Sequence, residues 1–267
     1  MKKNEIVLCP CKSGKKYNEC CELTGLLDFF KEQNLKYFDE NYAFSNLFEK
    51  DQIFRNFYMQ NRSKINKPVF YVKSNQMKSK ASFGRIGDVG YFITTKYSKI
   101  PVSESIHIAH EIEHLVLVSE GFETAKLKNN NSPIDYQKFI NDMIYDPKVN
   151  RELINYGYNL NEYLNTADSI QMKIIGRNLN HPGNEFLSLT LYVKKFLDYM
   201  NLNPNIKPEE IEFNKWIESH YPHLIIKSKH ILGIIERNGT ETPREARKTL
   251  IKIIAYLNLN DQLQIGN

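Results

Sequence analysis

The sequence predicts an α+β protein that is mostly helical, with one small sheet ahead of a histidine-rich helix and a short zinc-binding head at the N-terminus. Apolar residues recur at three- and four-residue intervals over most of the chain, which is typical of helices packed on a core. Residues 68–100 are instead rich in β-branched and aromatic residues and contain several glycines, which favours strands. All four cysteines lie within the first 21 residues, a clustering that indicates a metal site rather than disulfides that staple a core.

The composition is that of an ordinary globular protein. With 41% hydrophobic and 25% charged residues, a chain of 267 residues can bury a sizeable core. No stretch approaches the roughly 18 to 20 apolar residues of a membrane helix, and the N-terminal apolar run is too short for a secretory signal. We therefore expect a cytoplasmic protein without a membrane span. The net charge of +5 is too weak to signal nucleic-acid binding.

The first half of the chain divides into segments of different character. Residues 1–22 have too few apolar residues for a core, so that a metal would have to organise them. Residues 23–62 predict two or three helices, and residues 68–100 predict three or four strands. A helix follows over residues 103–120, with Ser103 or Ser105 as its N-cap.

Prolines and capping residues mark the helices of the second half. We expect one helix to begin with Ser132 as cap and Pro133 in its first turn. Asp146 and Pro147 should end that helix and open the next. Further helices are expected over residues 160–176, 184–201, 208–219 and 222–237.

The last helix carries a capping box, with Thr242 as cap, Pro243 in the first position and Glu245 as the reciprocal partner. From these elements we expect a head over residues 1–22, a main domain over residues 23–200, and a C-terminal helical part over residues 201–267 that packs on the same domain.

The stretch "HEIEH" at residues 110–114 predicts a metal site on a buried helix. Side chains at positions i and i+4 of a helix share a face, so His110 and His114 can both reach one Zn²⁺ at about 2.0 to 2.1 Å. Glu111 lies beside that pair and can serve as general base for a metal-bound water. The alternative is that the histidines only hydrogen-bond within the core; His107, three residues earlier, fits that role better.

The same stretch resembles the HExxH signature of zincin metallopeptidases, and "VGYFITT" lies upstream where zincins carry the strand that binds the substrate backbone. This resemblance implies a zincin-like catalytic domain that hydrolyses peptide bonds. Leu117 and Glu120 stand where the metzincin subclass needs Gly and His, which excludes that subclass.

The gluzincin subclass implies a third ligand on a second helix, within N-E-x-x-S/T-D. "NDMIYD" at residues 141–146 is similar, with Asp142 at the ligand position and Asp146 at the end. It departs from the pattern by Asp for Glu and by Tyr145 for Ser or Thr. Asp142 is the predicted ligand, and the alternatives are Asp146, Glu120, Glu123 and Glu152. The residue that stabilises the oxyanion is left open among His181, Tyr156, Tyr158 and His223.

The head "CPCKSGKKYNECC" places two close pairs of thiolates, Cys9 with Cys11 and Cys20 with Cys21, which could close a tetrahedral zinc shell. This stretch closely resembles the SEC-C motif, which bacterial proteins carry as a small appendage. The resemblance implies a structural zinc and docking to a partner, for which the lysines of the head could supply contacts.

The sequence thus predicts a zinc metallopeptidase with one catalytic and one structural Zn²⁺ and a protein or peptide substrate. Two alternatives remain open. The chain could be a zincin-like regulator without catalysis, or an adaptor that works only through its SEC-C head.

Overall fold

The computed structural model describes residues 36–38, 40–77, 80–86, 90–129, 134–177 and 182–266. The expected class is confirmed, because the described chain is α+β and mostly helical with small sheets. It forms two compact units, Met1–Ser119 and Glu120–Asn267. The cysteine head predicted for residues 1–22 lies outside the described residues, and so do Cys9, Cys11, Cys20 and Cys21.

A four-stranded sheet lies in the first unit. Its order is β1-β2-β4-β3; β2 and β4 are parallel, and the other neighbours are antiparallel. Among the described strands, β3 therefore lies at an edge of the sheet, and β4 has a neighbour on each side. The strands are β1 (Lys36–Phe38), β2 (Val69–Lys73), β3 (Ala81–Ile86) and β4 (Gly90–Thr95).

Three of these strands confirm the sheet predicted for residues 68–100, but the helical prediction for residues 23–62 was wrong at β1. Three residues are too short to show a strand alternation, and β1 forms by pairing with β2. The helical elements of this unit are α2 (Glu40–Ala43), α3 (Ser45–Lys50), α4 (Gln52–Asn61), η2 (Arg62–Lys64), η3 (Val102–Glu104) and α5 (Ser105–Ser119).

Aromatic rings fill the core of the first unit. The Phe44 ring is fully buried and meets four other rings at centroid distances from 4.4 to 5.8 Å, those of Phe48, Phe54, Tyr58 and Tyr71. Asp51 begins α4, because its carboxylate accepts a hydrogen bond from the Phe54 amide at 2.9 Å.

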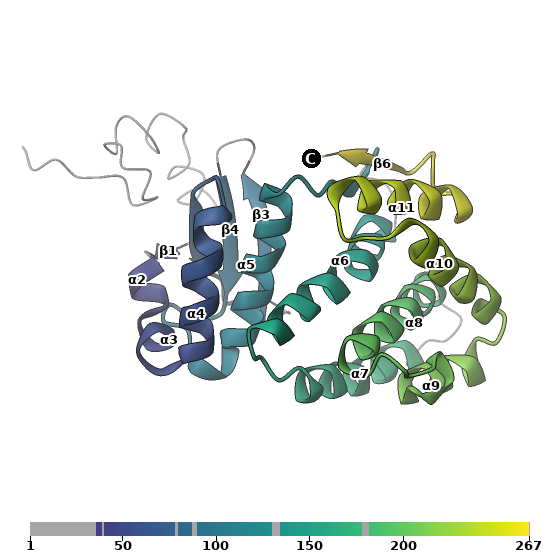
Figure 1. Cartoon of the computed structure of the whole chain (residues 1–267), viewed down its shortest axis with the longest axis horizontal. Coiled ribbons are helices and arrows are strands. Elements are labelled where there is room, and N and C mark those ends of the chain that lie inside the picture. Colours follow the sequence, from purple (N-terminus) through teal and green to yellow (C-terminus); the bar gives the residue numbers. More distant parts are fainter. Residues whose placement is uncertain are drawn as a thin grey trace, which may run out of the picture. The chain divides into compact units, whose positions relative to one another are not determined.

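Helix α5 is the predicted histidine helix, and it lies against β3 and β4 with α4 beside it (Figure 1). Its buried side chains occur all round the helix and include Ile108, Ile112 and Val116. A helix with apolar residues on every side is one that the fold buries. Three histidines and two glutamates on such a helix must therefore find partners within the protein.

The second unit is built mainly from helices. Helix α8 packs against α6, α9 and α10, and α11 packs on α10 (Figure 1). Its elements are β5 (Thr124–Leu127), α6 (Tyr136–Asn155), α7 (Asn161–Gly176), α8 (Pro182–Leu202), η4 (Pro208–Glu210), α9 (Glu212–His220), α10 (Leu224–Asn238), α11 (Pro243–Tyr256) and β6 (Leu263–Gly266).

Helix α6 corrects the prediction of two helices that meet at Asp146 and Pro147. The helix runs through Pro147, which lies buried in its interior. A proline inside a helix removes one hydrogen bond and costs about 3 kcal/mol or more. Burial of apolar side chains on the turns before and after Pro147, such as Ile144 and Val149, offsets that cost. The N-cap of α6 is Asp135, whose carboxylate accepts from the Lys138 amide at 3.1 Å; Ser132 and Pro133 lie outside the described residues.

A second sheet, which the sequence analysis did not anticipate, pairs β5 with β6 antiparallel. The other edge of β5 bonds to side chains of α6. Asn141 accepts from the Ala125 amide at 2.8 Å and donates to the Ala125 carbonyl at 3.0 Å, and Gln137 accepts from the Leu127 amide at 3.0 Å. A helix thus takes the place of a third strand, and these bonds fix the rotation of α6.

The capping box predicted for the last helix is confirmed. The Thr242 hydroxyl accepts from the Glu245 amide at 3.3 Å, and the Glu245 carboxylate accepts from the Thr242 amide at 3.0 Å. The chain divides into compact units at residues 119 and 120, whereas the predicted division at residues 200 and 201 falls inside α8.

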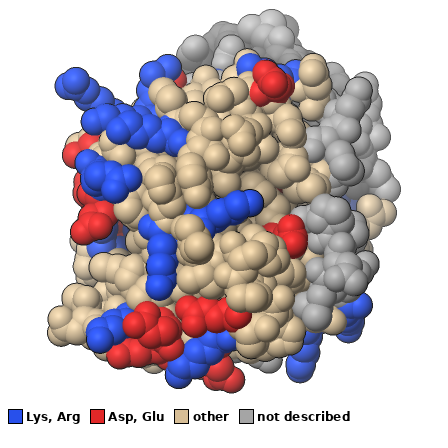
Figure 2. Space-filling view, turned by 90° about the vertical axis from the view of Figure 1, so that its right-hand side faces the viewer, with Lys and Arg blue, Asp and Glu red and all other residues tan. Residues whose placement is uncertain are grey.

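The surface of the second unit carries both signs of charge. On the face that includes α9, α10 and α11, basic and acidic side chains are interspersed (Figure 2). In α11, for example, the exposed Arg247 pairs with Glu123. Among the described residues, no helix is long and apolar enough to cross a membrane.

Candidate metal centre

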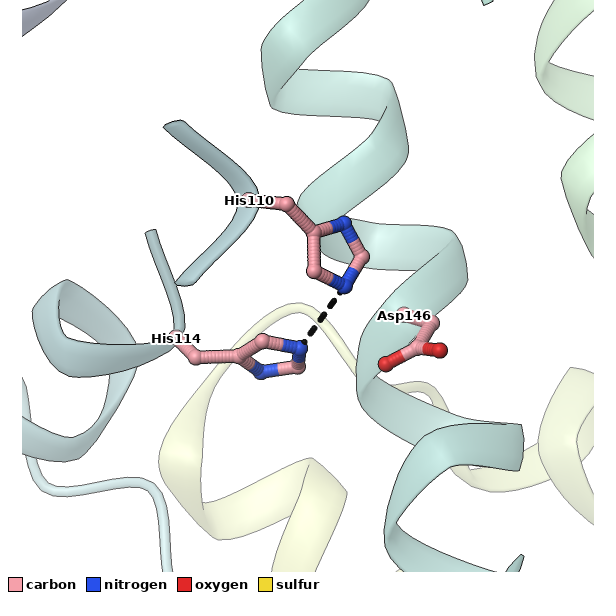
Figure 3. Close-up of side chains that lie close together, drawn as sticks. All are labelled: His110, His114 and Asp146. Carbon is pink, nitrogen blue, oxygen red and sulfur yellow. Dashed lines mark hydrogen bonds between the residues drawn. The ribbon is translucent and has the colours of Figure 1, made fainter. Parts of the chain in front are cut away.

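Helix α5 brings the two motif histidines together, as their spacing predicts. The Nε2 atoms of His110 and His114 are 3.1 Å apart, and the ring centroids are 4.7 Å apart with the planes at 74° (Figure 3). His110 is 7% exposed, and His114 is partly buried. Two ring nitrogens therefore face one another in a largely dehydrated place.

Phe83 of the edge strand β3 holds two of the motif residues. Its ring stacks on His114, with centroids 5.3 Å apart and planes at 25°. Its backbone amide donates to Oε2 of Glu111 at 2.9 Å. Because that N–H donates to Glu111, it points away from β4, toward the side of β3 where no described strand pairs. The proposed general base is therefore fixed at the edge of β3.

On α6, Asp142 and Asp146 lie on one face, because they are four residues apart. The face changes from solvent to core along the helix. The Asp142 side chain is 34% exposed and pairs with Lys138 at 2.8 Å. The Asp146 side chain is 15% exposed, and Asn150, one turn further, is fully buried.

Asp142 and Asp146 belong to the second unit, whereas His110 and His114 (Figure 3) belong to the first. Within the second unit the Asp146 carboxylate lies 3.5 Å from Nζ of Lys194. The sequence preferred Asp142 and kept Asp146 as an alternative. Asp142 is instead placed one turn nearer to solvent, where Lys138 holds its carboxylate.

The two histidines fit a zinc ion in donor type and spacing. Imidazole is a ligand that Zn²⁺ takes in catalytic sites, where one position stays open for water or substrate. Ligand nitrogens at about 2.0 to 2.1 Å from a tetrahedral zinc lie about 3.3 to 3.4 Å apart, close to the observed 3.1 Å. The same distance also allows a direct hydrogen bond between one protonated and one unprotonated nitrogen.

The other candidates have different neighbours. His107 lies 3.7 Å from the Glu104 carboxylate, which also binds Lys80, and burial lowers the pKa of His107. Glu123 pairs with Arg247. Among the oxyanion candidates, His223 pairs with Glu185 at 2.9 Å, and His181 lies outside the described residues.

Two residues near these ligands escaped the sequence analysis. Phe83 gave no signal, since an aromatic residue in a strand is ordinary. Lys194 did give a signal in the sequence. The stretch "VKKFLD" places two lysines in an apolar helix, with Asp198 four residues after Lys194, and lysines in such a helix need buried partners. Burial lowers the pKa of Lys194, but the carboxylates of Asp198 and Asp146 outweigh it and raise that pKa above its usual value.

Comparison with known proteins identifies no relative of this chain. A scan of family models finds none that matches the chain, and searches of curated proteins and of solved structures find no match either.

Proposed function

We propose that the protein is a zinc-dependent metallopeptidase in which His110 and His114 hold the metal and Glu111 is the general base. The observation that carries this proposal is the approach of the two histidine Nε2 atoms to 3.1 Å. The HExxH spacing supplies the two histidines and the base. Of the two carboxylates of α6 that the sequence offers as third ligand, we propose Asp146, because its side chain is less exposed than that of Asp142.

The chemistry requires a water activated for attack on a peptide carbonyl. Bound zinc supplies a Lewis acid that lowers the pKa of a bound water to about 7. Glu111 has one carboxylate oxygen, Oε2, held by the Phe83 amide. The other oxygen, Oε1, takes a proton from the attacking water and delivers it to the amide nitrogen of the leaving peptide. Phe83, by fixing Oε2, orients Oε1 for this task.

The substrate strand is the second part of the proposal. The stretch "VGYFITT", which resembles the substrate-binding strand of zincins, is β4 with one residue before it, but β4 is paired on both sides. Among the described strands, β3 is the edge strand beside α5, so an extended peptide can pair with β3 and lie next to Glu111. This geometry favours an unstructured peptide segment as substrate.

The substitution Glu111→Gln tests the catalytic role. It should leave zinc binding unchanged and abolish hydrolysis of a peptide library, because the amide cannot accept the proton. Asp142→Asn is the matched control and should retain both properties. Zinc would be measured by competition with a chelator, and cleavage by mass spectrometry of the library.

Other results would favour the alternatives. Zinc bound at His110 and His114 without any cleavage by the wild-type chain would favour a zincin-like regulator. Zinc that is lost only when the four cysteines are replaced would favour an adaptor with a SEC-C head. Two zinc ions per chain are expected if the head and the histidine site both bind metal.

A further inference from the structure

Lysines gather at one end of the sheet in the first unit. Lys36 of β1 lies directly opposite Lys73 of β2, and Lys73 in turn pairs with Thr95 of β4. Lys96 follows Thr95, and Lys99 comes three residues later. Because neighbouring strands lie about 4.8 Å apart, Lys36, Lys73 and Lys96 mark the same end of three consecutive strands.

We call Lys36, Lys73, Lys96 and Lys99 the lysine patch. Three of these residues are exposed, and Lys73 is half-buried. Among the described residues, no carboxylate lies within ion-pair distance of the four ammonium groups. Lys36 and Lys73 are also directly opposite each other, and like charges in that position destabilise a sheet. The patch therefore carries positive charge that the described part of the chain does not balance.

Two buried carboxylates of the same unit have cations of their own. Glu40 is 6% exposed and accepts a hydrogen bond from Arg62 at 2.8 Å. Glu104 is also 6% exposed and pairs with Lys80 at 2.7 Å. The charges of these two carboxylates are thus matched within the fold, and the lysine patch remains positive.

The sheet end that carries the lysine patch continues to the edge strand β3. Ala81, the first residue of β3, pairs with Thr95, so Lys80 lies beside Lys96 at this end of the sheet. Lys80 itself is held by Glu104. A peptide that pairs with β3 passes Lys80 as it leaves the sheet, and from there its chain can turn across the ends of β4, β2 and β1. The lysine patch thus lies next to the path of the proposed substrate.

We propose that the lysine patch binds an acidic stretch of the peptide substrate, beside the segment that pairs with β3. This inference rests on the proposed function for the substrate strand, and it adds the charge of the residues that flank that strand. Complementary charges of this kind speed the encounter of two molecules and select among partners.

A single-stranded nucleic acid fits the lysine patch less well than an acidic peptide does. Such ligands bind by stacking their bases on aromatic rings. The exposed ring of Tyr42 already stacks on Phe38, with centroids 5.6 Å apart, and the Lys99 ammonium lies 5.0 Å from its centroid. The patch therefore offers ammonium groups for carboxylates, and its Tyr42 ring is already engaged.

The test measures peptide binding by the full-length chain that carries Glu111→Gln, so that cleavage does not disturb the equilibrium. The probe is a fluorescein-labelled peptide with a run of glutamates beside an uncharged segment, and its matched partner has glutamines instead. Lys36→Gln with Lys73→Gln is compared with Lys227→Gln and Lys229→Gln, which remove the same charge from two exposed lysines of α10. Binding is measured by fluorescence anisotropy at low and at physiological salt.

We expect the chain with Lys36→Gln and Lys73→Gln to bind the glutamate peptide roughly 5-fold more weakly or worse, and the α10 control to stay within about twofold of the parent. Salt should weaken binding of the glutamate peptide, and the glutamine peptide should bind weakly throughout. Reversal of both charges, Lys36→Glu with Lys73→Glu, should turn the preference toward a lysine peptide, which a misfolded chain would not do. If these double variants do not fold, Lys96→Gln should give a smaller loss in the same direction.

Two outcomes would overturn the proposal. In the first, the chain with Lys36→Gln and Lys73→Gln binds the glutamate peptide as tightly as the α10 control does. In the second, a labelled oligothymidylate binds the parent chain more tightly than the glutamate peptide does and loses its affinity with the same two substitutions, which would make the patch a nucleic-acid site. Failure of the proposed function would be seen differently: the wild-type chain would cleave neither peptide, while the Glu111→Gln chain still bound the glutamate peptide through the patch.

Discussion

Replacement of Asp146 by Asn tests which carboxylate of α6 is the third metal ligand. The substitution keeps the shape of the side chain but removes its charge. The Asp146 side chain is 15% exposed and lies 3.5 Å from Nζ of Lys194. Asp142, one turn earlier on the same face, is 34% exposed and paired with Lys138. The two substitutions, Asp146→Asn and Asp142→Asn, therefore differ only in their position along α6.

The expected magnitudes differ strongly. Loss of a charged ligand should weaken zinc binding at least as much as loss of an outer partner, about 100-fold, which corresponds to about 2.7 kcal/mol. At a zinc concentration of about 100 times the parent dissociation constant, zinc stabilises the parent chain by about 2.7 kcal/mol and the Asp146→Asn chain by only about 0.4 kcal/mol. Asp142→Asn loses one exposed helical ion pair, a change of about 0.5 kcal/mol or less without zinc.

Chemical unfolding with and without zinc, in the chain that carries the four cysteine-to-serine substitutions, measures these differences directly. The zinc-dependent part of the unfolding free energy should nearly vanish in Asp146→Asn and persist in Asp142→Asn. The reasoning is refuted if Asp146→Asn retains the parent affinity within about threefold, or if Asp142→Asn loses more affinity than Asp146→Asn does.

Three further predictions concern the fold that carries the site. Thr242→Ala removes one half of the capping box and should cost about 1 kcal/mol in urea unfolding; a second substitution, Glu245→Ala, should then add less than it does alone. Asn141→Leu leaves the amide and carbonyl of Ala125 unbonded and should cost about 2 kcal/mol, with faster hydrogen exchange at the Ala125 amide; slow exchange there would contradict this role. Burial lowers the pKa of His107, so the unfolded chain binds a proton before the folded chain does. The unfolding free energy should therefore fall as the pH decreases through about 6.5, and His107→Gln should flatten that part of the curve.

Features that depend on neighbours in sequence could be predicted well. The i, i+4 spacing of His110 and His114 on a helix is enough to bring their rings together, and the structure has them 3.1 Å apart at Nε2. The capping box of Thr242 and Glu245 is equally local, and it was predicted in full. In such cases, the helical geometry alone places the interacting atoms.

Predictions that ignored long-range packing failed. β1 and β5 are short strands that form only because β2 and β6 lie beside them. Pro147 was read as a helix boundary from its local preference, but packing on both sides of it keeps α6 continuous. Tertiary contacts override local preferences when the burial they provide exceeds a cost of a few kcal/mol.

The sequence by itself determined that two histidines and a glutamate share one helix, and its resemblance to gluzincins predicted a carboxylate ligand on a later helix. It preferred Asp142 to Asp146, although residues four apart lie on the same face of a helix. Only the tertiary structure decided how differently these two carboxylates are buried. It ties α6 to β5 through Asn141, leaves Asp142 near solvent with Lys138, and buries Asp146 beside Lys194. A buried carboxylate is costly unless a cation or a hydrogen-bond donor lies beside it, and burial is set by the packing of the whole chain.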